Sequence, residues 1–139
     1  MNWLFWSLLS ALFAGATAIL AKIGIKGIDS NLATAIRTTV ILVFTWAIAV
    51  STEQHGAIRS ISTKGWTFLA LSGFATGLSW LCYFRALQLG PASAVAPIDK
   101  LSVVFVILLA WLFLGEGLSA QKIIGGLFIT IGAITLARG

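Results

Sequence analysis

Residues 91–114 have the sequence PASAVAPIDKLSVVFVILLAWLFL, an apolar run that nevertheless contains Pro97, Asp99 and Lys100. A helix of about 20 residues crosses a hydrocarbon core about 30 Å thick, so this run is long enough to span a membrane. An ionised group near the bilayer centre costs roughly 2.5–3.5 kcal/mol, whereas a Leu or Ile returns only about 0.3–0.6 kcal/mol. We therefore expect one side of this span to face protein, water or a ligand, and we expect functional residues there.

Apolar runs also fill most of the chain on either side of this stretch. The expected spans are residues 3–25, 31–50, 65–89, 91–114 and 119–137. The long polar stretch Ser51–Lys64 is expected to be a surface loop, and Asp29 or Ser30 and Ser119 are suited to cap the helices that follow them. No strand-like alternation of apolar and polar residues indicates a barrel. The sequence predicts an all-α membrane protein with five transmembrane helices in one domain, residues 1–139.

The composition limits the class of protein. The chain has 59% hydrophobic and 9% charged residues, while soluble domains have about a quarter charged residues. The apolar run begins at Trp3 without a basic region before it, so we expect the first helix to be retained and the protein to be multi-pass in the cytoplasmic (inner) membrane. The 9 Lys and Arg residues are scattered, which excludes a nucleic-acid patch. Cys82 is the single cysteine, so neither a disulfide nor a metal site is expected.

Pro97 is predicted to kink the fourth helix. Proline has no amide hydrogen, so the carbonyl of Ser93 lacks its usual partner. Broken transmembrane helices are tolerated where they line a cavity. Asp99 and Lys100 follow directly, and neighbouring helical positions diverge by about 100°, so we do not expect these two side chains to pair with each other.

Two interpretations of Asp99 and Lys100 stay open. Asp99 could form a structural ion pair with Lys22 or Arg85, or else Asp99 or Lys100 could contact a substrate. Lys22 follows Ala14 and Ala18 at four-residue steps, and Arg85 similarly follows Gly73, Gly77 and Leu81. These small-residue faces are expected to pack against other helices, and their cations either snorkel or contribute to the site.

The embedded charges favour an anionic or zwitterionic solute. Lys22, Arg37, Arg85 and Lys100 outnumber Asp99, the one embedded acid available for proton coupling. Aromatic residues, including Trp80 and Tyr83, either line a pocket or anchor the helices at the membrane interface. The candidate substrate or gating residues are Asp99, Lys100, Pro97, Lys22, Arg85, Trp80 and Tyr83. No nucleophile with a base, metal-ligand set or phosphate-binding loop indicates an enzyme, and no cofactor is expected.

Several segments resemble the EamA domain of the drug/metabolite transporter superfamily. They are FRALQLGPASAVAPIDKLSVVFVILLAWLFLGE (84–116), GEGLS (115–119), IGGLFITIGAITL (124–136), AKIGIKGID (21–29) and NLATAIRT (31–38). Proteins of this family commonly carry two five-helix repeats of opposite orientation, whereas one repeat is present here. The resemblance implies a ten-helix transporter assembled from two copies, with substrate bound between them and exposed alternately to each side.

The charges in the loops and at the ends of the spans do not fix an orientation. Arg59, Lys64 and Lys122 would lie on one side, and Lys26 and Arg138 on the other. So weak a bias permits insertion in both directions, and an antiparallel homodimer is the favoured assembly.

The leading hypothesis is a secondary transporter of small organic metabolites that works as a homodimer by alternating access. One alternative is a lipid or lipid-carrier flippase subunit, which would bind a membrane lipid headgroup at the same cations. The other is a non-transporting membrane scaffold or accessory subunit.

Overall fold

The computed structural model describes residues 2–139. All regular secondary structure within these residues is helical, and they contain no strand. Five helical segments are long and apolar enough to cross a membrane: Trp3–Gly24, Ser30–Ser51, Thr63–Leu89, Ala92–Leu114 and Ala120–Arg138. The predicted all-α fold with five transmembrane helices is therefore confirmed. Ser51–Lys64 was predicted to be a surface loop, and in the structure this stretch contains a short 3-10 helix, η1 (Gln54–Ser60).

The chain divides into two compact units. The terminal unit contains the residues up to Ile23 together with Leu89–Gly139, and the hairpin unit contains Gly24–Gln88. The prediction of a single domain over residues 1–139 stays a prediction.

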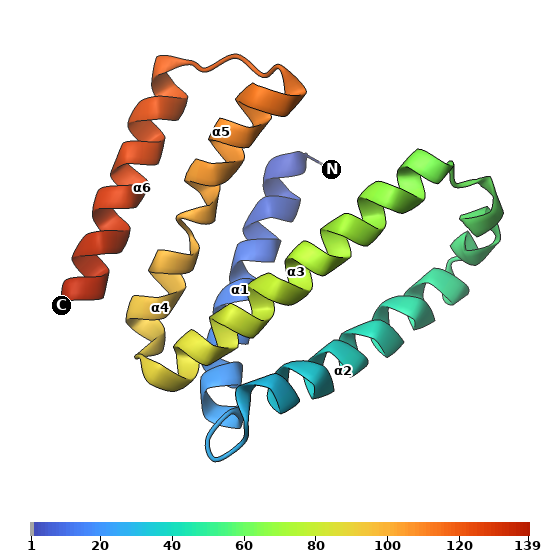
Figure 1. Ribbon diagram of the computed structural model, residues 1–139, viewed down its shortest axis with the longest axis horizontal. Helices are drawn as coiled ribbons and strands as arrows, with labels where there is room; N and C mark the ends of the chain where they lie inside the picture. Colours follow the sequence, from blue (N-terminus) through green and yellow to red (C-terminus); the bar gives the residue numbers. More distant parts are fainter. Residues whose placement is uncertain (1) are drawn as a thin grey trace. The chain divides into compact units, whose positions relative to one another are not determined.

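In the terminal unit, α4 (Ala92–Asp99) and α5 (Ser102–Leu114) form the fourth span, and α6 (Ala120–Arg138) returns antiparallel beside them (Figure 1). Gly115 ends α5 with a φ of 67°, in the left-handed region that glycine enters without steric penalty. Ser119 then caps α6 as predicted, because its hydroxyl oxygen accepts a 3.3 Å hydrogen bond from the amide of Lys122.

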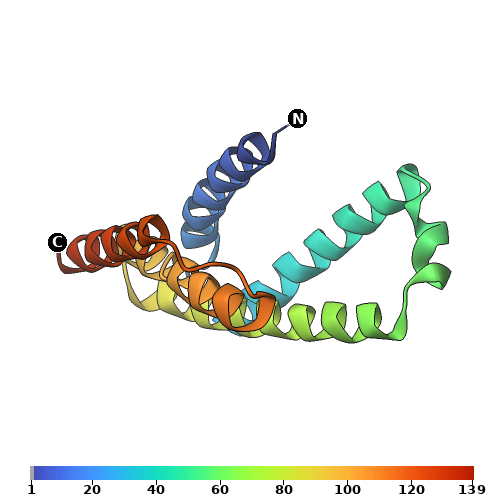
Figure 2. The same ribbon diagram turned by 90° about the horizontal axis from the view of Figure 1, so that it is seen from above.

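In the hairpin unit, α2 (Ser30–Ser51) and α3 (Thr63–Leu89) are joined through η1 and diverge toward it, as Figure 1 and Figure 2 both show. Asp29 is the cap of α2, and its carboxylate accepts hydrogen bonds from Asn31 and Leu32 at 2.9 and 3.2 Å. Gly27, with a φ of 74°, lies in the turn that connects α1 (Trp3–Gly24) to α2.

The distribution of apolar surface is that of a membrane protein. Large side chains such as Trp3, Phe74 and Phe113 are about three-quarters exposed on the isolated chain. The buried residues within 2–139 are instead few and mostly small: Ala18, Ala21, Ile25, Ser30, Thr34, Phe84, Leu87, Ala110, Gly126 and Ala133. Exposed apolar surface on this scale indicates contact with lipid or with another chain. The protein is a multi-pass integral membrane protein.

Candidate functional site

The fourth span is interrupted, although the kink predicted at Pro97 is not confirmed. Pro97 lies inside α4, and the break between α4 and α5 comes later, at Lys100 and Leu101. The amides of Lys100 and Leu101 bond to carbonyls three residues before them, at 3.1 and 3.0 Å, which is the tighter 3-10 spacing. Proline removes the bond to Ser93, one turn before Pro97, so the missing donor alone does not account for where the break lies.

Asp99 and Lys100 pair with each other, contrary to the prediction that they diverge. The Nζ of Lys100 lies 3.4 Å from the Oδ2 of Asp99, with side chains 56% and 37% exposed respectively. The prediction assumed a continuous helix, but Asp99 is the last residue of α4 and Lys100 lies in the turn that follows. The flexible lysine stem can fold back there. On the isolated chain both side chains are therefore partly accessible, and this surface lies within the candidate span Ala92–Leu114.

Lys22 and Arg85 have other neighbours. The Nζ of Lys22 donates a 2.8 Å hydrogen bond to the carbonyl of Gly90, just before the fourth span. The guanidinium of Arg85 donates to Gln88 at 3.1 Å, and the Gln88 amide donates to the carbonyl of Ile28 at 2.6 Å. Both cations are therefore engaged with the ends of helices, and their roles toward a substrate stay predictions.

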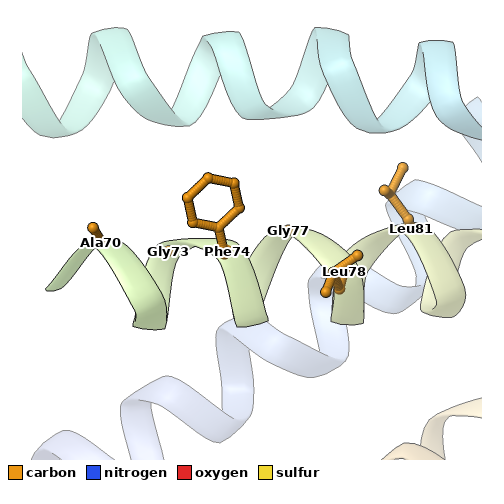
Figure 3. A pocket seen from close by; sticks show the side chains of 6 residues that line it. All are labelled: Ala70, Gly73, Phe74, Gly77, Leu78 and Leu81. Atoms are coloured by element: carbon orange, nitrogen blue, oxygen red, sulfur yellow. The ribbon is translucent and has the colours of Figure 1, made fainter. Parts of the chain in front are cut away.

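The two candidate aromatic residues lie on α3 and are half-buried. The Tyr83 ring meets the Phe84 ring edge-on, with centroids 5.7 Å apart. An apolar groove of about 410 Å³ lies elsewhere on α3, and Figure 3 shows its lining residues: Ala70, Gly73, Phe74, Gly77, Leu78 and Leu81. Trp80 and Tyr83 do not line this groove, and their pocket role stays a prediction.

Arg37 of α2 was not predicted from the sequence as a site residue, although it was counted among the embedded charges. Its guanidinium carbon lies 4.8 Å from the centroid of the Phe84 ring, in a cation–π contact between α2 and α3. Among residues 2–139, its Nε is the buried side-chain polar atom without a hydrogen-bond partner. Such an unsatisfied donor costs about 1–3 kcal/mol, and more when it is charged. The spacing of Ser30, Thr34 and Arg37 on one helical face was the available signal.

The part of the chain that the structure describes contains no evident set of metal ligands. No group of three or more His, Cys, Asp or Glu residues within residues 2–139 is placed to hold an ion.

Comparison with known proteins agrees with this architecture. The profile of the EamA-like transporter family matches residues 1–138. A protein of a Sinorhizobium species, described as "Uncharacterized transporter in cobO 3'region", is 53% identical over 136 residues, which cover 98% of this chain and 96% of that protein. No solved structure matches significantly. The match over nearly the whole chain and the five membrane-spanning helices establish that this protein belongs to the EamA-like transporter family.

Proposed function

We propose that this protein is a secondary transporter of small organic metabolites across the cytoplasmic membrane. The observation that carries the proposal is the break in the fourth span at Lys100 and Leu101, beside the partly exposed Asp99–Lys100 pair. Charged groups and irregular backbone at membrane depth are costly unless they line a cavity or contact a ligand. Transporters place substrate sites at such discontinuous helices. The family and the description of the Sinorhizobium protein support the same function.

The proposed working unit is a homodimer that operates by alternating access. The family profile matches residues 1–138, which contain five spans, and the alignment of 136 residues covers 96% of the Sinorhizobium protein. A second copy would cover part of the large apolar surface. Because the loop charges favour neither orientation, the two copies are proposed to insert in opposite directions, with the symmetry axis in the membrane plane.

The proposed substrate is an anion or a zwitterion. Lys22, Arg37, Arg85 and Lys100 lie within the spanning helices, with Asp99 as the acid among them. Their positive charge would be compensated by a carboxylate or phosphate group on the solute.

The test is counterflow in proteoliposomes. Vesicles loaded with an unlabelled amino acid, organic acid or nucleotide sugar are diluted into the labelled compound, and a carrier that alternates access accumulates the label transiently. Lys100→Gln should slow this exchange, whereas Lys122→Gln should not, although Lys122 also pairs with an acid, Glu116, at 3.0 Å. Lipid scrambling without solute exchange would identify a flippase subunit instead, and absence of both activities would identify a scaffold.

A further inference from the structure

Arg37 has a charged donor edge that its own chain leaves unsatisfied. The Nε atom is shielded and has no hydrogen-bond partner, and the recorded contact of the guanidinium is the face of Phe84. The face of the Phe84 ring attracts the guanidinium cation, but it does not accept hydrogen bonds from the N–H groups, which point outward in the guanidinium plane. The edge formed by Nε and one terminal nitrogen therefore remains suited to an oxyanion, which arginine binds with two parallel hydrogen bonds.

The residues around Arg37 on α2 do not supply that oxyanion. The buried hydroxyl of Thr34 donates to the carbonyl of Ser30 at 2.7 Å, and Thr38 donates to the carbonyl of Thr34 at 2.8 Å. Asp29, the acid at the start of α2, already accepts two backbone hydrogen bonds as the helix cap. Segment 30–38 contains no carboxylate of its own.

An apolar groove lies on α3, and the last residue that lines it is close in the sequence to the ring that Arg37 contacts. Gly73, Gly77 and Leu81 line it at four-residue steps, and Phe84 follows Leu81 by three residues, less than one helical turn. A Cβ added at Gly73 or Gly77 would meet nothing within 4 Å, so the glycines leave the groove open (Figure 3). The hairpin unit thus has an open apolar groove of about 410 Å³ on α3 and, close to it in the sequence, the contact of Arg37 with Phe84.

We propose that Arg37 anchors the carboxylate or phosphate of an amphiphilic organic anion, whose apolar part lies in the α3 groove. Phe84 holds the guanidinium plane, and a change of the Arg37 rotamer over the ring uncovers Nε to the anion. This inference rests on the proposed transport function and assigns that function its substrate class. The anionic group belongs either to a soluble organic acid or to a membrane lipid.

The first experiment measures equilibrium binding of acetate, butanoate and hexanoate to the detergent-purified protein by thermal stabilisation at constant ionic strength. Wild-type protein should be stabilised by hexanoate, and Arg37→Lys should weaken hexanoate binding by at least about tenfold, because lysine keeps the charge without the two-pronged edge. Arg59→Lys, at an exposed position of η1, is the control and should bind as wild type. Unchanged hexanoate affinity in Arg37→Lys would overturn the proposal, as would the absence of any binding.

Phenylglyoxal modification of the wild-type protein gives a readout that does not depend on how a variant folds. Hexanoate should protect Arg37 and not the exposed Arg59 of η1 from modification, as located by peptide mass spectrometry. Protection of both residues or of neither would contradict an anchor at Arg37.

The second experiment tests the groove. Affinity should rise about fourfold per methylene from acetate to hexanoate, the increment expected for burial of a CH₂ group. Gly77→Leu should abolish this rise while leaving acetate binding unchanged. Gly132→Leu is the control, because Gly132 of α6 is equally open. A chain-length dependence that survives Gly77→Leu would remove the groove from the site.

The third experiment identifies the source of the anion. It compares the concentrations at which dihexanoyl phosphatidic acid and sebacate displace bound hexanoate. A lower concentration for the phosphatidic acid would identify a lipid ligand, and a lower concentration for sebacate would identify a soluble organic acid. Because binding is measured without flux, the two proposals can fail separately. Binding at Arg37 without counterflow would reject transport alone, while counterflow that is independent of Arg37 would reject the anchor alone.

Discussion

The ammonium group of Lys22 donates a 2.8 Å hydrogen bond to the carbonyl oxygen of Gly90 and so joins two points 68 residues apart. Gly90 directly precedes Pro91, whose carbonyl accepts the first hydrogen bonds of the fourth span, from Ala94 and Val95. The end of α1 therefore helps to fix where the interrupted span begins.

Replacement of Lys22 by Met should destabilise the protein, since it removes a charged hydrogen bond to a backbone carbonyl in a partly buried place. Such bonds contribute about 1.5–3 kcal/mol. Thermal melting in detergent should show the loss, with Lys26→Met, at an exposed position of the α1–α2 connection, as the control. If Lys22→Met melts like the wild type but loses transport, Lys22 acts on the substrate and not on the fold.

Asp99→Asn and Lys100→Gln should assemble normally, because their ion pair is partly accessible on the isolated chain and both replacements are neutral side chains that still form hydrogen bonds. Both should slow transport if the break in the fourth span is the site. Assembly is checked by native mass spectrometry and transport by counterflow. Full transport in both variants would exclude the fourth span, and failure to assemble would make the pair structural.

Pro97→Ala should stabilise the fourth span, because alanine restores an amide that can bond to the Ser93 carbonyl and has a helix propensity about 3 kcal/mol better in helix interiors. We expect slower exchange together with a higher melting temperature, since a more rigid span resists rearrangement. A variant that exchanges faster than wild type would show that proline does not serve mobility here.

Asp29→Ala should cost about 1 kcal/mol of stability, because the carboxylate caps α2 through two amides. Asp29→Asn should retain most of that stability, since an amide oxygen also accepts hydrogen bonds. Equal melting temperatures for the two variants would mean that the charge, and not the cap, is what matters.

A cysteine at the exposed position Ala57 of η1, in a Cys82→Ala background, tests the orientation of the chain. In intact cells, an impermeant thiol reagent should label about half of the molecules if the two copies insert in opposite directions, as inverted pairs require. Labelling of all molecules or of none would show a single orientation.

The sequence predicted the spans well, because span length and the placement of glycine, proline and capping residues are local properties. Asp29 and Ser119 cap their helices as their positions indicated. The pairing of Asp99 with Lys100 was predicted wrongly, since it depends on where the helix breaks. The three-residue hydrogen bonds at Lys100 and Leu101 mark that position, which the amide that Pro97 lacks does not account for.

Arg37 was harder to place by sequence. An embedded arginine near a helix start looks like one that snorkels, and only the position of Phe84, 47 residues later in the chain, shows that the guanidinium turns toward α3. The spacing of residues on α2 can mark the helical face that carries Arg37, but it does not show which residue of α3 lies beside it. The composition therefore indicated a cationic interior, while the structure was needed to identify which cation has an unsatisfied edge.

Because open space surrounds several glycines in the isolated chain, replacing them can show where the protein contacts other molecules. At Gly15, Gly73, Gly125 and Gly132, within helices, an added Cβ meets no atom within 4 Å. Alanine at each should by itself favour the helix by up to about 1 kcal/mol. A position where alanine nevertheless impairs the protein must therefore touch something outside this chain. Alanine replacement, glycine by glycine, would trace the footprint of neighbouring molecules on the membrane-facing surface.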